Sequence, residues 1–149
     1  MPAPTGTRAL QAGAAVIYYV APGGTGDCTS WATACDLQTA LVAAVSGDEI
    51  WAAAGVYKPA ADPADRTATF QLKAGVPIYG GFAGGETSRE ARDPAANVTV
   101  LSGDLSGDDG ANFANNGENS YHVVTGAIDA ILDGVTITAG NANGDMALA

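Results

Sequence analysis

The sequence predicts an all-β protein in which short strands follow one another around a solenoid that carries one helix near its start. Three observations predict this class: short apolar segments rich in β-branched and aromatic residues, 20 glycines in 149 residues, and one helical stretch. The clearest segment runs from Phe70 to Phe82, where two apolar runs meet at Lys73-Ala74-Gly75. No crossover helix fits between them, so the segment predicts a strand, a corner and a second strand.

The other strands are predicted from the same composition, with glycine, proline, asparagine or aspartate between them. Their expected ranges are 16–20, 49–54, 97–101, 121–124, 130–132 and 135–138, and residues 55–59 predict a turn. Strand centres near Ile78, Val100 and Val123 are 22 and 23 residues apart, a nearly constant step that is typical of solenoids. An antiparallel sandwich stays open as the alternative, although only Asp133-Gly134 is typical of a tight hairpin.

One amphipathic helix is expected at residues 36–45, ahead of most of the strands. Asp36 is its predicted N-cap, because an aspartate side chain accepts hydrogen bonds from the free N–H groups of the first turn. Its apolar face has helical spacing and comprises Leu37, Leu41, Ala44 and Val45. A helix in this position is expected to cover the open end of a sheet.

Composition and charge exclude several classes of protein. Hydrophobic residues make up 47% of the chain, which excludes a disordered chain. The net charge is −10 and only six residues are basic, so we expect no binding to nucleic acid. No apolar run approaches the ~20 residues of a membrane helix, so we expect no membrane insertion.

Two cysteines, Cys28 and Cys35, lie close together in the sequence. We expect a local disulfide, and two buried thiols are the alternative. Zinc is not favoured, because His122 is the only histidine. A disulfide indicates an oxidising compartment, so the expected location is secreted or at the cell surface.

The chain is expected to have two parts. Residues 1–15 predict a flexible segment that is too polar for a signal peptide, and residues 16–149 predict one domain. The turn residues near position 145 lead to no terminating motif, so we expect an N-terminal piece of a longer protein.

The ordered set of strands and corners resembles the N-terminal region of bacterial right-handed parallel β-helix repeat proteins of the pectin-lyase-like superfamily. The segments that carry the resemblance are 46–51, 55–59, 69–72, 78–82, 101–104, 121–124 and 132–137. The resemblance implies a short right-handed parallel β-helix with a capping helix, in an extracellular protein. It implies no particular reaction, because that superfamily includes lyases, hydrolases, adhesins and structural proteins.

Residues 102–120 form a long acidic segment with candidate metal ligands. Calcium prefers oxygen ligands in flexible, glycine-broken loops. The candidate calcium ligands are Asp104, Ser106, Asp108 and Asp109. Glu118 comes later, and an acidic loop that is simply solvated is the alternative.

No residue pattern predicts catalysis. His122 is a lone histidine in a predicted strand, without a serine or cysteine partner in a motif. Asp104, Asp108, Asp109 and Asp133 could supply a carboxylate pair for glycoside hydrolysis, but a turn role explains Asp133. Strand aromatics such as Trp51 and Tyr79 could stack on sugar, although such residues are more often packed in cores.

The sequence therefore predicts a non-catalytic extracellular structural or adhesion module. An open last strand is expected to drive self-association or head-to-tail stacking into homo-oligomers. The alternative is the N-terminal part of a calcium-dependent protein that binds or cleaves polysaccharide. The residues expected to point inward are Ile50, Phe70, Leu72, Val76, Ile78, Val98, Val100, Val123, Ile131, Val135 and Ile137.

Overall fold

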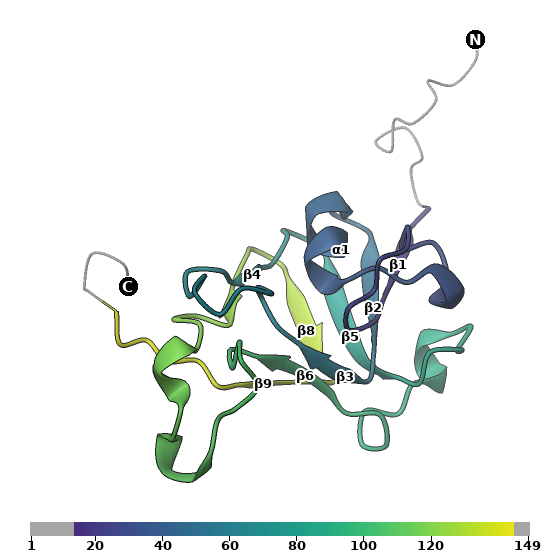
Figure 1. Cartoon of the computed structure of the whole chain (residues 1–149). Coiled ribbons are helices and arrows are strands. Elements are labelled where there is room, and N and C mark those ends of the chain that lie inside the picture. Colours follow the sequence, from purple (N-terminus) through teal and green to yellow (C-terminus); the bar gives the residue numbers. More distant parts are fainter. Residues whose placement is uncertain (1–13, 145–149) are drawn as a thin grey trace.

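The computed structural model describes residues 14–144, which form three β-sheets, one α-helix and four short 3-10 helices (Figure 1). The expected flexible segment 1–15 lies outside the described residues, except for its last two. The strands are β1 (Ile17–Val20), β2 (Glu49–Ala53), β3 (Gly55–Tyr57), β4 (Phe70–Gln71), β5 (Pro77–Phe82), β6 (Thr99–Ser102), β7 (Val124–Thr125), β8 (Ile131–Asp133) and β9 (Val135–Thr138). The helices are α1 (Leu37–Ala43), η2 (Trp31–Thr33), η3 (Arg89–Ala91), η4 (Ala111–Phe113) and η5 (Asn116–Glu118).

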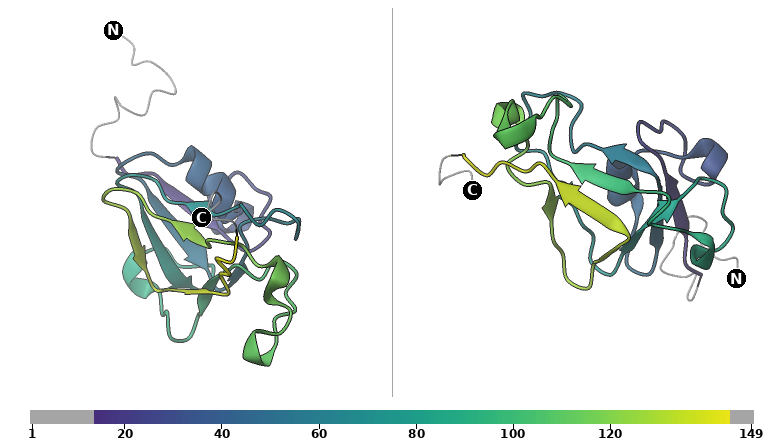
Figure 2. Two further views of the ribbon diagram at one scale, coloured as in Figure 1. Left: turned by 90° about the vertical axis from the view of Figure 1, so that its left-hand side faces the viewer. Right: turned by 90° about the horizontal axis from the view of Figure 1, so that it is seen from below.

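The three sheets are built from parallel strands. Sheet A has the order β1-β2-β5-β8, sheet B the order β3-β6-β9, and sheet C contains β4 and β7. From β2 onward the chain enters sheets A, B and C in that order and then repeats the cycle. Figure 2 shows β3, β6 and β9 side by side in the view from below. All pairings between these strands are parallel, so the antiparallel sandwich is wrong.

The nearly constant spacing of 22 and 23 residues between predicted strand centres is not the spacing between neighbouring strands of one sheet. Ile78 lies in sheet A, Val100 lies in sheet B, and Val123 immediately precedes the sheet C strand β7. Within sheet A, Ile50 pairs with Ile78 and Ile78 pairs with Leu132, which are steps of 28 and 54 residues. Successive passages differ in length because loops of different length connect the strands.

The corners between sheets are tight at two places. The segment 70–82 forms β4, a corner and β5, as its pattern predicts. Residues 55–57 form β3 and not the expected turn, because the corner falls directly before them. Gly55 has a φ of +132°, which lets the chain turn from sheet A into sheet B with one intervening residue after β2.

The core lies between the three sheets and α1. Most of the predicted inward residues that precede the last strands are buried: Ile50, Phe70, Leu72, Val76, Ile78 and Val123. The prediction for β6 is wrong by one residue, because Thr99 and Leu101 are buried while Val98 is exposed and Val100 is half-buried. The buried Thr99 is satisfied, since its Oγ1 accepts a hydrogen bond from the Gly81 N–H at 2.9 Å.

Three predicted inward residues belong to the last strands: Ile131, Val135 and Ile137. The prediction for β8 is wrong by one residue, because Ile131 pairs with Pro77 while Leu132 pairs with the buried Ile78. Ile137 pairs with the buried Leu101 but is 49% exposed, and Val135 is half-buried. Both lie in β9, which pairs with a neighbour on one side only among the described strands.

The helix α1 closes the N-terminal side of the core. The Asp36 Oδ1 accepts a hydrogen bond from the Thr39 N–H at 2.7 Å, which confirms the predicted N-cap. Its buried residues are Leu37, Ala40 and Leu41, which pack toward β1 and β4. Val45 is exposed and not on the buried face, because the helix ends at Ala43 and the next residue is extended.

Candidate functional site

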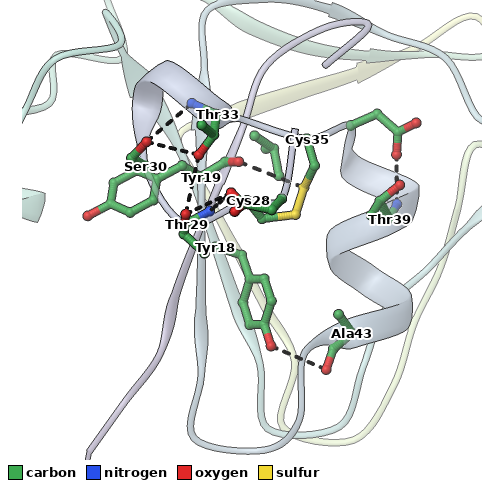
Figure 3. Close-up of a disulfide and its surroundings, with 12 residues drawn as sticks. Tyr18, Tyr19, Cys28, Thr29, Ser30, Thr33, Cys35, Thr39 and Ala43 are labelled. Atoms are coloured by element: carbon green, nitrogen blue, oxygen red, sulfur yellow. Dashed lines mark hydrogen bonds between the residues drawn. A yellow bond between two sulfur atoms is a disulfide. The ribbon is translucent and has the colours of Figure 1, made fainter. Parts of the chain in front are cut away.

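A disulfide joins Cys28 and Cys35 beside the start of α1, as their spacing predicts (Figure 3). Their Cα atoms are 4.7 Å apart and both residues are buried. The loop is further fixed by Asp27, whose Oδ1 accepts hydrogen bonds from the Thr29 hydroxyl at 2.7 Å and the Thr29 N–H at 3.1 Å. Hydrogen bonds from the side chains of Thr29 and Thr33 and from the Thr29 N–H lower the pKa of Asp27 to about 2.

The disulfide loop also occupies the outer edge of sheet A. The Tyr19 N–H donates to the Cys28 carbonyl at 2.9 Å, and the Ala21 N–H donates to the Cys35 carbonyl at 3.0 Å. In return, the Cys35 N–H donates to the Tyr19 carbonyl at 3.1 Å. We call residues 27–43, which comprise this loop and α1, the N-terminal cap. It takes up the outward-facing N–H and C=O groups of Tyr19, so this part of β1 is not available for pairing with another strand.

Within residues 14–144, the opposite side of the molecule has no such cover. Among the described strands, β7, β8 and β9 each pair with one neighbour only, and we call this side the open end. Figure 2 shows α1 and the N-terminal strands at one end of the molecule and the yellow strand β9 at the other. Three isoleucines near this end are exposed: Ile128, Ile131 and Ile137.

A shallow depression of about 470 Å³ lies at the open end, between residues 121–124 and residues 137–140. It is lined by both apolar and polar groups, among them Val123, Ile137 and His122. His122 is exposed, and no hydrogen bond or ion pair joins it to another described residue. The depression is therefore an extension of the uncovered edge and not an enclosed pocket.

The acidic segment brings four carboxylates together. Ligand oxygens of Asp104, Asp108, Asp109 and Glu118 all lie within 4.8 Å of one another, and we call these residues the acidic cluster. Three of them are predicted calcium ligands, and Glu118 joins them from η5. The predicted ligand Ser106 is exposed, and its backbone N–H donates to the Glu118 Oε2 at 3.3 Å. Coordination by the Ser106 hydroxyl stays a prediction.

The pKa values of Asp104 and Glu118 move in opposite directions. Desolvation acts to raise the pKa of Asp104, but N–H groups of Asp109, Gly107 and Asp108 and the charge of Lys58 outweigh it and lower the pKa. Burial raises the pKa of Glu118, and the nearby carboxylates of Asp104 and Asp108 raise it further. The charged form of Glu118 is therefore disfavoured in the cluster.

Buried oxygen atoms without hydrogen-bond donors lie at the same place. The Glu118 Oε2 accepts from the Leu105 N–H at 3.1 Å, but its Oε1 is buried and has no partner. Asn119 is 1% exposed; its Nδ2 donates to the Asp109 Oδ2 at 2.6 Å, while its Oδ1 has no partner. Such groups are uncommon in folded proteins, because leaving a buried oxygen without a donor costs free energy.

The outer face of sheet A carries a row of aromatic residues that includes Trp51 and Tyr79, which the sequence offers for stacking on sugar. Tyr19 pairs with Trp51 and Trp51 pairs with Tyr79, so their side chains share the outer face. Arg89 and Arg92 cover the Tyr79 ring, at 4.6 and 5.1 Å from its centroid. This row is packed against other side chains, which argues against an open sugar-stacking surface there.

Ion pairs hold the two arginines over this face. Arg89 pairs with Glu49 at 2.8 Å, and Arg92 pairs with Asp133 at 2.8 Å. Arg92 also donates to the Gly80 carbonyl at 3.0 Å. The segment 83–98 is therefore fastened across β2, β5 and the corner after β8. These contacts give Asp133 a structural partner.

Within residues 14–144, no helix has the length and apolar character needed to cross a bilayer. No family model, curated protein or solved structure matches this chain. The resemblance to β-helix repeat proteins therefore stays a prediction that rests on the residues themselves.

Proposed function

We propose that this chain is the capped start of a right-handed parallel β-helix that serves as a non-catalytic structural or adhesion module outside the cell. The observation that supports this most is the asymmetry of the two ends: the N-terminal cap occupies one edge of sheet A, whereas no residue among 14–144 forms such a cap at the open end. The cyclic order of sheets A, B and C supports the β-helix. The disulfide is compatible with an extracellular location.

Self-association through the open end is part of this proposal. Edge strands offer unpaired N–H and C=O groups, and the exposed Ile137 offers apolar surface beside them. Head-to-tail stacking is disfavoured in sheet A, because the disulfide loop already pairs with β1. Two copies that meet through their open ends form a closed symmetric dimer.

The test is analytical ultracentrifugation of the chain over a wide concentration range. We expect a monomer–dimer equilibrium, in which Ile137→Lys raises the dissociation constant at least tenfold. Val56→Lys is the matched control, because Val56 is 51% exposed but lies in β3, at the opposite edge of sheet B. A wild-type chain that remains monomeric at the highest concentrations would falsify the self-association.

The salt dependence of the dissociation constant is a second test of the monomer–dimer equilibrium. Each copy carries a net charge of −10, so two copies repel each other. Added sodium chloride screens this repulsion and is expected to strengthen the dimer. Polysaccharide binding stays the alternative prediction, and calorimetry with a panel of polysaccharides tests it on the same protein.

A further inference from the structure

The acidic cluster lies in a loop that is built around one of its own carboxylates. The Asp104 side chain accepts hydrogen bonds from the N–H groups of Gly107 at 2.6 Å, Asp108 at 3.1 Å and Asp109 at 3.0 Å. These bonds fold residues 104–109 into a tight loop and bring Asp108 and Asp109 next to Asp104. The loop compensates the charge of Asp104 but not that of its neighbours.

The surroundings of Glu118 and Asn119 point independently to a cationic ligand. Both residues have a buried side-chain oxygen without a donor, and the Asn119 side chain is directed at the Asp109 carboxylate. These oxygens can only accept or coordinate; the Glu118 oxygen belongs to the acidic cluster, and the Asn119 side chain adjoins the cluster through Asp109. A cation satisfies such a set of oxygens, whereas an anion would add to the repulsion.

The ligand chemistry selects among cations. The cluster contains four carboxylates and neither histidine nor cysteine, which favours calcium or magnesium over zinc. The loop contains Gly107 and is followed directly by Gly110, and two of the four carboxylates are exposed. Calcium accepts six to eight oxygens in irregular geometry, including water, while magnesium requires a near-ideal octahedron.

The geometry points to a calcium site formed by Asp104, Asp108, Asp109 and Glu118, with the buried side chain of Asn119 beside it, where its Nδ2 donates to the Asp109 carboxylate. The ion holds the loop at 104–109 against the segment at 118–119. This segment is in turn bound to the body of the protein, because the Arg66 Nε donates to the Asn119 carbonyl at 2.7 Å. Calcium therefore fastens the long connection between β6 and β7, independently of the proposed self-association.

The experiment is calorimetric titration of the chain with calcium chloride, together with thermal unfolding followed by circular dichroism. We expect one calcium ion per chain and a rise in Tm of about 3–6 °C at a calcium concentration ten times Kd. Asp108→Asn and Glu118→Gln are each expected to weaken calcium binding at least tenfold. Without calcium, both variants should unfold at the wild-type temperature or above it, because each removes a repelling charge.

Glu90→Gln is the matched control. Glu90 is exposed and makes no hydrogen bond or ion pair with another described residue, so this variant should bind calcium as the wild type does. Three results would overturn the site: no rise in Tm with calcium, an equal rise with magnesium at the same concentration, or a calcium response that Glu118→Gln leaves unchanged.

Discussion

At the scale of single residues, Gly81 shows how closely the chain packs where it leaves sheet A. Its φ is +98°, and a Cβ atom would lie 2.7 Å from the backbone of Pro94. Gly84 has a φ of +112° but has nothing within 4 Å of such an atom. Alanine at either position is strained by about 1–3 kcal/mol because of φ alone.

We expect Gly81→Ala to lower the free energy of unfolding by about 1–3 kcal/mol more than Gly84→Ala, because only Gly81 adds a steric overlap. Urea denaturation of both variants measures this difference. Equal losses for the two variants would show that Pro94 moves aside without cost.

Asp27 provides a prediction for pH. Its folded pKa is about 2, below the ordinary value of 3.8, because Thr29 and Thr33 donate hydrogen bonds to the carboxylate. The stabilisation is therefore complete above pH 4 and is lost as the pH falls toward 2. The difference in urea midpoint between the wild type and Asp27→Asn should shrink over this window, and NMR titration of the carboxyl carbon should give a midpoint near 2. A midpoint near 3.8 would contradict the bonded arrangement.

The side chains of β6 show where residue patterns mislead. Val98, Thr99, Val100 and Leu101 alternate between two faces, and valines are more apolar than threonine, so the sequence favours the wrong register. Thr99 is buried because its hydroxyl accepts the Gly81 N–H, which comes from a bend in β5. No local pattern reveals that bond, since the two residues belong to different sheets.

At the scale of elements, the N-terminal cap depends on a short covalent loop. Removing the disulfide in the double variant Cys28→Ala/Cys35→Ala should lower the free energy of unfolding by about 2–3 kcal/mol, mainly because the unfolded chain gains freedom. Urea denaturation with and without dithiothreitol measures it. The reductant should destabilise the wild type and leave the double variant unchanged, and a wild type that does not respond to reductant would contradict this role.

Elements with strong local signals were predictable and long loops were not. The N-cap of α1 and the corner at 73–75 follow from residues that are adjacent in sequence. The acidic cluster was predictable only for the three aspartates, which lie within six residues. Glu118 reaches them because Asn112, Phe113 and Asn115 adopt positive φ values and reverse the chain, and such a path has no signature in the sequence.

At the scale of the whole molecule, parallel pairing sets the architecture. The predominance of short strands without intervening helices was predictable, and the structure confirms the β-rich, parallel character. The lengths of the passages were not predictable, because pairing fixes the strands but places little limit on the loops between them. In sheet B, Val56 pairs with Val100 and Val100 pairs with Thr136, steps of 44 and 36 residues.

The N-terminal cap has a consequence for how the protein is made. During synthesis the cap and β1 to β3 emerge before the strands that pair with them, so a finished surface is ready when the next strands arrive. Each strand from β5 onward can add in parallel to a strand that has already been made, as in other repeat-like structures. The sheets extend away from the N-terminal cap, and the strand added last is the one whose edge is exposed to solvent.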